Sequence, residues 1–138
     1  MIIISAIDDN YGMMFNHRRV SQDKILRQEI IELTKESKLF MNEYSVAQFS
    51  DCMQDKINVD EDLMENAGQG DFCFVENEDI LPYLEKIEKI FIYKWNRKYP
   101  SDFKFPKEIL LSFEKKEERE FVGNSHEKIS LEIYERIL

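Results

Sequence analysis

Cysteine is scarce in this sequence, which contains only Cys52 and Cys73. Neither residue belongs to a CxxC pair or to the Cys-His spacings of zinc sites. Cys73 lies in the apolar run at residues 72–75, which favours a buried, unreactive thiol. The pattern therefore disfavours both a disulfide and a cysteine-bound metal.

Histidine is equally rare, since His17 and His126 are the only two. The HExxH and HxHxDH patterns that gather zinc ligands do not occur, so we expect no metal site and no metal-dependent hydrolase. A P-loop, a GxGxxG fingerprint and a GxSxG nucleophile elbow are also missing. No short catalytic motif therefore assigns a function.

Long apolar runs are missing as well. The run at residues 1–4 is too short for a signal peptide or a membrane span, so we expect a cytoplasmic protein without membrane contact. With 28 acidic and 19 basic residues, the net charge of −9 repels nucleic-acid phosphates. Nucleic acid is therefore a disfavoured partner, and the basic triplet at residues 17–19 is the local exception.

The residues that are present indicate one globular domain, spanning residues 1–138, with 43% apolar and 34% charged side chains. Strands are expected at residues 1–7, 38–41, 72–75, 89–95, 109–113 and 128–136, and helices at 21–35, 45–49, 60–67 and 79–87. The charged run at 114–120 is interpreted as a solvated loop or strand end. Strands that alternate with helices before an antiparallel finish are typical of an α/β fold with a mixed sheet.

The first long helix carries the residues closest to a recognisable site. Ser21 is placed as its N-cap, and Asp23 lies in the first turn, where a carboxylate suits the helix dipole. Leu26, Ile30 and Leu33 fall on one face, so the helix is amphipathic. This pattern predicts that the helix covers one face of the sheet.

Both ends of the sequence contain a recognisable order of segments. Residues 89–106 hold an apolar strand and a loop that ends in Phe-Pro, residues 124–126 read Asn-Ser-His, and residues 134–136 read Tyr-Glu-Arg. Near the start, Ala-Ile-Asp at 6–8 precedes Gly12. This order resembles dihydrofolate reductase. The resemblance implies a single dihydrofolate reductase-like domain with a mostly parallel mixed sheet, antiparallel C-terminal strands and helices on both faces.

For the cofactor, the resemblance implies NADPH. It would place the backbone of Ala6 and Ile7 beside the nicotinamide and Gly12 in a mobile active-site loop. Ser45 would keep the one hydroxyl near the phosphates. The family's Gly-Arg pair, which admits and neutralises those phosphates, is replaced by Asn-Glu at residues 42–43.

A second phosphate contact is altered in the same sense, because Glu76 and Asn77 stand where the family has Gly-Gly. On the substrate side, Leu26 takes the place of the family's pterin-binding carboxylate. Asp23, about one helical turn earlier, could restore that role as proton donor or orienting group. Tyr93 takes the place of the substrate-side threonine. These changes argue against ordinary folate reduction.

The segment from Arg18 to Ser21 suggests a different ligand. Arg18 and Arg19 precede a helix N-terminus, where Ser21 and the helix amides could complete an anion site. The alternative is a solvent-facing loop in which both arginines pair with nearby carboxylates of this acidic chain.

Three functional hypotheses remain open. The first is a diverged, non-folate protein of this fold that binds a small ligand, anionic if the arginines hold it, between the first strand, the Ser21 helix and Tyr93. The second is an NAD(P)H-dependent reductase, which is the only enzyme class the sequence supports. The third is a protein- or RNA-interaction module that uses Arg18 and Arg19. The ligand, the oligomeric state and the presence of catalysis are left open.

Overall fold

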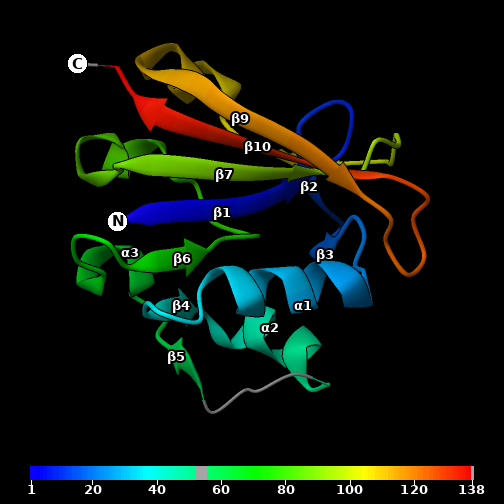
Figure 1. Ribbon diagram of the computed structural model, residues 1–138, viewed down its shortest axis with the longest axis horizontal. Helices are drawn as coiled ribbons and strands as arrows, with labels where there is room; N and C mark the ends of the chain where they lie inside the picture. The colour runs from blue at the N-terminus through cyan, green and yellow to red at the C-terminus, as the bar shows by residue number, and fades with distance from the viewer. Residues whose placement is uncertain (52–55, 138) are drawn as a thin grey trace.

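The computed structural model describes residues 1–51 and 56–137, and within them the chain forms one sheet of seven strands in the order β5-β4-β6-β1-β7-β10-β9. The strands are β1 (Ile2–Ile7), β4 (Leu39–Met41), β5 (Ile57–Val59), β6 (Phe72–Phe74), β7 (Lys89–Lys94), β9 (Phe113–Phe121) and β10 (Ile129–Arg136). Neighbours from β5 to β7 are parallel, whereas β10 is antiparallel to β7 and β9. Figure 1 shows β1 and β7 side by side with β10 and β9 beyond them. The predicted α/β fold with a mostly parallel mixed sheet is confirmed.

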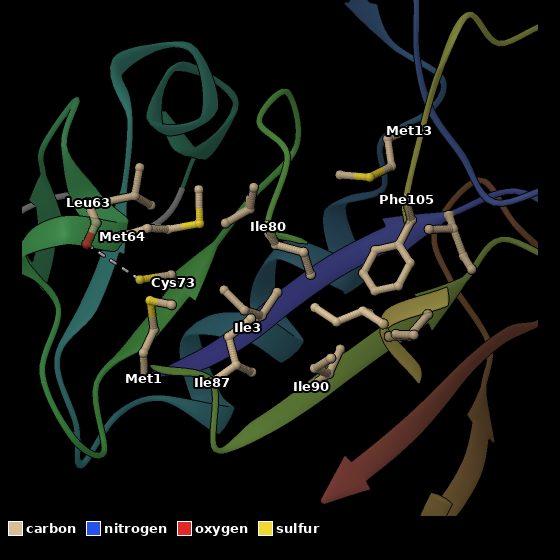
Figure 2. Close-up of a cluster of buried hydrophobic side chains, with 14 of the residues drawn as sticks. Met1, Ile3, Met13, Leu63, Met64, Cys73, Ile80, Ile87, Ile90 and Phe105 are labelled. Atoms are coloured by element: carbon tan, nitrogen blue, oxygen red, sulfur yellow. Dashed lines mark hydrogen bonds between the residues drawn. The ribbon is translucent and has the colours of Figure 1, made fainter. Parts of the chain in front are cut away.

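Helical segments cover both faces of this sheet, as predicted. They are α1 (Lys24–Leu33), α2 (Glu43–Val46), α3 (Leu63–Asn66) and the 3-10 turns η1 (Ala47–Phe49), η3 (Leu81–Lys86) and η4 (Lys107–Ser112). Along β1 successive side chains point to opposite faces, so Ile3 and Ile4 belong to different buried clusters. Leu26 of α1 joins the cluster of Ile4, whereas Ile109 of η4 joins that of Ile3. Figure 2 shows Leu63 of α3 in the same cluster as Ile3.

The helical segments differ from the prediction in length and in type. α1 and α3 are shorter than the helices expected at 21–35 and 60–67. The helix expected at 45–49 is α2 followed by η1, which together span residues 43–49, and the helix expected at 79–87 is the 3-10 turn η3. The N-cap of α1 is Asp23, which accepts hydrogen bonds from the amides of Ile25 (2.8 Å) and Leu26 (3.3 Å). The prediction that Ser21 caps this helix is therefore wrong. Both residue types cap helices well, and the nearer one takes the role.

The expected strand at residues 109–113 is also wrong, because residues 109–112 belong to η4 and only Phe113 begins a strand, β9. Pro106 precedes η4, and a short apolar run carries no period that separates strand from helix. The strand is instead the charged run at 114–120, for which a solvated loop or a strand end was expected, and which forms most of β9, the edge strand of the sheet. Charges on both of its sides discourage pairing with another chain.

A second, three-stranded sheet was not predicted. It joins β2 (Gly12–Phe15), β3 (Arg18–Arg19) and β8 (Phe103–Lys104). Asn16 and His17 form the two-residue turn between β2 and β3 with φ of 51° and 64°. Two successive positive φ values are those of the turn that matches strand twist in a hairpin. The hairpin carries both arginines of the basic triplet on β3.

Cys73 is fully buried on β6, and its thiol faces the carbonyl of Leu63 at 3.9 Å (Figure 2). Burial raises the pKa of this thiol to about 12, which leaves it protonated and unreactive at neutral pH. The prediction for Cys73 is thus confirmed, while Cys52 lies outside the described residues. Within residues 1–51 and 56–137, no helix has the length and apolar character needed to cross a membrane.

Candidate functional site

The carboxyl ends of β4 and β6 meet at one edge of the sheet, and Glu76 lies between them. Its carboxylate is almost buried and accepts hydrogen bonds from Ser45 Oγ at 2.8 Å and from Arg19 Nε at 2.9 Å. Arg19 Nη2 reaches the second carboxylate oxygen at 3.2 Å, so the contact is bidentate. Two residues expected at a ligand site, Arg19 and Ser45, are therefore brought together, but on a carboxylate of the chain itself.

Tyr44 and Asn42 complete this edge. The Arg19 guanidinium lies 4.4 Å from the centre of the Tyr44 ring, and the Arg19 amide donates to Tyr44 Oη at 2.8 Å. The Asn42 side chain caps α2 by accepting from the Ser45 amide at 3.0 Å and donates to Asn77 Oδ1 at 2.9 Å. The contacts of Arg19 with Glu76 and Tyr44 hold the β2–β3 hairpin against the sheet, and those of Asn42 join the start of α2 to the segment after β6.

Asp23 faces a different partner, the loop between β9 and β10. Its carboxylate accepts from the backbone amides of Asn124 (3.0 Å) and Ser125 (2.8 Å) and lies 2.9 Å from Nδ1 of His126. Burial by itself raises the pKa of Asp23, but the hydrogen bonds from Asn124, His126, Ser125 and Leu26 outweigh it and hold the pKa well below its ordinary value. Asp23 is therefore ionised at neutral pH.

The opposite edge of the His126 ring faces two hydroxyl groups. Nε2 lies 2.9 Å from Ser21 Oγ and 3.2 Å from Tyr99 Oη, and Tyr99 Oη donates to Ser21 Oγ at 3.3 Å. The ring itself stacks on Trp95, with centroids 4.6 Å apart. His126 is only 4% exposed, and Ser21 is half-buried. The Asp23 carboxylate, the His126 imidazole and the Ser21 hydroxyl therefore form a continuous hydrogen-bonded row that begins in the interior and ends at Ser21.

A cavity of about 320 Å³ meets these hydrogen-bonded groups at Tyr99. It is lined by Phe15, Asn16, Arg18, Arg19, Val20, Tyr99 and Pro100. Arg18 is exposed and has no ion-pair partner among the described residues. The cavity is thus lined by the guanidinium of Arg18, by the aromatic rings of Phe15 and Tyr99, and by the Tyr99 hydroxyl.

Tyr93, the expected substrate-side residue, is fully buried. Its ring meets Phe121 edge-on at 6.1 Å and belongs to the same apolar cluster as Leu26 and Ile30 of α1. Burial raises the pKa of its hydroxyl, which has no hydrogen-bond partner within the described part of the chain. The space between β1, α1 and Tyr93 is therefore packed with side chains.

Tyr93→Phe is expected to raise the free energy of unfolding by about 1 kcal/mol, because it removes a buried hydroxyl that makes no hydrogen bond. Tyr134→Phe is the matched control, since Tyr134 Oη donates to Glu132 at 2.8 Å and its loss should destabilise. Urea unfolding of both variants measures the difference. A loss for Tyr93→Phe as large as that of the control would contradict the burial of an unpaired hydroxyl.

The residues expected at the nicotinamide lie within the sheet and its first loop. Ala6 and Ile7 are paired with Tyr93 and Lys94 on β7. The Gly12 amide donates to Asp8 Oδ1 at 2.7 Å, and a Cβ there would lie 2.6 Å from that of Ser101. Glycine is thus required at residue 12 by close packing. Whether these residues hold a cofactor stays a prediction.

A solved structure supports the fold assignment. Dihydrofolate reductase from Enterococcus faecalis, complexed with NADP(H) and RAB-propyl, matches with a TM-score of 0.68 over 99% of this chain and 96% of that chain. The fold is that of dihydrofolate reductase. The two sequences are 10% identical, so the likeness concerns the fold alone. No protein-family model and no curated protein matches this sequence.

Sequence reasoning missed the contact between Ser21, His126 and Tyr99, which come from three distant segments. No local spacing in the sequence links His126 or Tyr99 to Ser21. In the described part of this reductase fold, no group of three or more His, Cys, Asp or Glu side chains is placed to hold a metal ion.

The free energy of unfolding is expected to fall as the pH drops below about 4. Because the folded pKa of Asp23 lies below its ordinary value of 3.8, its contribution is complete above that value and is lost as the pH falls towards the folded pKa. Urea unfolding of the wild type and Asp23→Asn between about pH 2.5 and 6 measures this. The free energy of unfolding of the variant should depend less steeply on pH than that of the wild type. Equal dependence on pH in the two proteins would contradict the role of Asp23.

Proposed function

We propose that this chain is a diverged dihydrofolate reductase-like protein that binds a small anionic ligand and does not reduce folate. The observation that carries the proposal is the cavity beside the β2–β3 hairpin, in which Arg18 offers a guanidinium without a carboxylate partner among the described residues. Phe15 and Tyr99 supply apolar walls. A volume of about 320 Å³ suits a small molecule.

The alternative, an NAD(P)H-dependent reductase, draws support from the NADP(H) with which the Enterococcus faecalis enzyme is complexed. Two features of this chain argue against it. Glu76, which stands where the resemblance implies glycine beside the pyrophosphate, holds Arg19 in a bidentate ion pair. Asp23 is ionised and engaged by the β9–β10 loop, so it has no proton to donate at neutral pH.

An interaction module built on both arginines has less support, because Arg19 is paired with Glu76 and stacked on Tyr44. Arg18 alone remains exposed on β3. A single arginine in a protein of net charge −9 is a weak basis for binding RNA.

The test is a titration with benzoate and phenyl phosphate, followed by calorimetry and by thermal shift. We expect saturable binding that Arg18→Glu abolishes, because it reverses the charge that attracts the anion. Lys98→Glu is the matched control, since Lys98 is exposed and its reversal changes the net charge equally. Binding that is absent in the wild type, or lost equally in both variants, would contradict the proposal.

A further inference from the structure

We propose that Ser21, His126 and Asp23 form a nucleophile–base–carboxylate triad, and that this chain hydrolyses small esters that carry a negative charge. The inference rests on the proposed function, because Arg18 in the adjoining cavity would attract that charge. It goes further in assigning a reaction and the group that performs it.

The distances are those of an activated serine. Ser21 Oγ lies 2.9 Å from His126 Nε2, and His126 Nδ1 lies 2.9 Å from Asp23 Oδ2. Because an ionised carboxylate only accepts hydrogen bonds, Nδ1 carries the proton and Nε2 is left to accept the serine proton. The same arrangement on unrelated folds is recognised by its geometry and not by position in the sequence.

The surroundings hold the base in this orientation. The Asp23 side chain is fully buried and that of His126 is 3% exposed, so water does not compete for the contact between them. Trp95 stacks on the imidazole and prevents its rotation. Four backbone amides and the Ser125 hydroxyl also bond to the Asp23 carboxylate, which keeps it available to stabilise an imidazolium.

Ser21 is free to react because the helix does not use it. Asp23 takes the capping role, so the Ser21 hydroxyl contacts only His126 and Tyr99 among the described side chains. Val20, directly before Ser21, and Tyr99 both line the cavity. The amide of Gln22, the residue after the nucleophile, makes no hydrogen bond to a described residue, and in this proposal it is the donor to the oxyanion.

The reaction balances without a cofactor. Ser21 Oγ forms a bond to the ester carbonyl carbon while its proton passes to Nε2 of His126. The bond from carbon to the leaving oxygen breaks, and that oxygen takes the proton and departs as an alcohol. Water, deprotonated by the same nitrogen, then attacks the acyl carbon. The bond from that carbon to Ser21 Oγ breaks, Oγ takes the proton back from Nε2, and the carboxylic acid is released. Ester and water are thus converted to acid and alcohol with no change in oxidation state.

The test combines active-site labelling with turnover. The full chain is treated with a fluorophosphonate and analysed by peptide mass spectrometry. Hydrolysis of mono-p-nitrophenyl succinate and of p-nitrophenyl acetate is followed by the absorbance of the released p-nitrophenolate. We expect label on Ser21, faster turnover of the anionic ester, and a fall of both rates to the buffer rate in Ser21→Ala. Ser37→Ala, which changes an exposed serine between α1 and β4, should retain wild-type rates.

The outcomes separate this inference from the proposed function. Saturable benzoate binding without label on Ser21, or with rates unchanged in Ser21→Ala, overturns the triad and leaves the ligand site standing. If Ser21 is labelled and both esters are hydrolysed at rates that Arg18→Glu does not change, the preference for an anionic substrate is contradicted. A thermal melt of Ser21→Ala is expected to show a folded protein, because Ser21 caps no helix.

Discussion

Replacing Asp23 with alanine is expected to lower the free energy of unfolding by about 3–5 kcal/mol, the range for breaking a buried ion pair. The carboxylate holds four backbone amides and the His126 ring, and all of these lose their acceptor at once. The helix also loses its N-cap, which alone costs about 1 kcal/mol. Urea unfolding monitored by far-UV circular dichroism measures the loss.

Asp62→Ala is the matched control for this substitution. Asp62 also stands at the N-cap of a helix, α3, but it is exposed and its side chain accepts no capping hydrogen bond. Its replacement should change stability little. If both variants lost the same small amount, the carboxylate of Asp23 would not be the link between α1 and the β9–β10 loop.

Glu76→Ala is expected to cost about 2–3 kcal/mol, somewhat less than a fully buried pair, because Arg19 keeps 18% of its side chain exposed. Among the described residues, the substitution leaves the Arg19 guanidinium with Tyr44 as its remaining partner, and it removes the acceptor of Ser45 Oγ. In a double-mutant cycle with Arg19→Ala, the double variant should lose less than the sum of the single variants.

The exposed pair between Arg119 and Glu29 is the control for that cycle. Its nitrogen–oxygen distance is also 2.9 Å, but 49% of the Arg119 side chain is exposed. Screening by water limits such pairs to about 0–1 kcal/mol. A coupling energy for Arg19 and Glu76 no larger than that of the control would mean that the sheet edge is not held by their ion pair.

Most of the sheet could be predicted from the sequence because its strands have local signals. The apolar run that contains Ile3 and Ile4 and the alternation in residues 128–136 each specify a strand without help from distant residues. β9 could not be predicted in this way, because every inner residue from Glu114 to Glu120 is charged and exposed. Its pairing with β10, and not its own composition, makes it a strand.

The candidate site shows the same limit more sharply. Ser21 and Asp23 are neighbours on one turn of chain, but His126 lies 105 residues from Ser21, and only the β9–β10 loop brings it to them. The ion pair of Arg19 was anticipated from the sequence, because pairing with a nearby carboxylate was one of the two alternatives for this residue. The sequence did not indicate that this partner is Glu76, because the β2–β3 hairpin that carries Arg19 to the sheet edge has no apolar period.

The replacements at residues 42–43 and 76–77 gain a physical meaning from the structure. Glu76 forms an ion pair with Arg19. The positive charge of Arg19 is therefore engaged by a carboxylate of the chain itself. Asn42 likewise uses its side chain for the cap of α2 and for the contact with Asn77. At the edge where the resemblance implies a dinucleotide, the polar side chains of Asn42 and Glu76 are therefore hydrogen-bonded to other residues of the chain.

Whether this edge is closed to a dinucleotide is decided by titrating the wild-type chain with NADPH, read by nucleotide fluorescence and by thermal shift. We expect neither saturable fluorescence nor a rise in melting temperature up to about 1 mM nucleotide, because a ligand that binds would stabilise the folded state by mass action. Saturation at micromolar NADPH, with a matching rise in melting temperature, would show instead that the ion pair of Arg19 and Glu76 does not close the cofactor site.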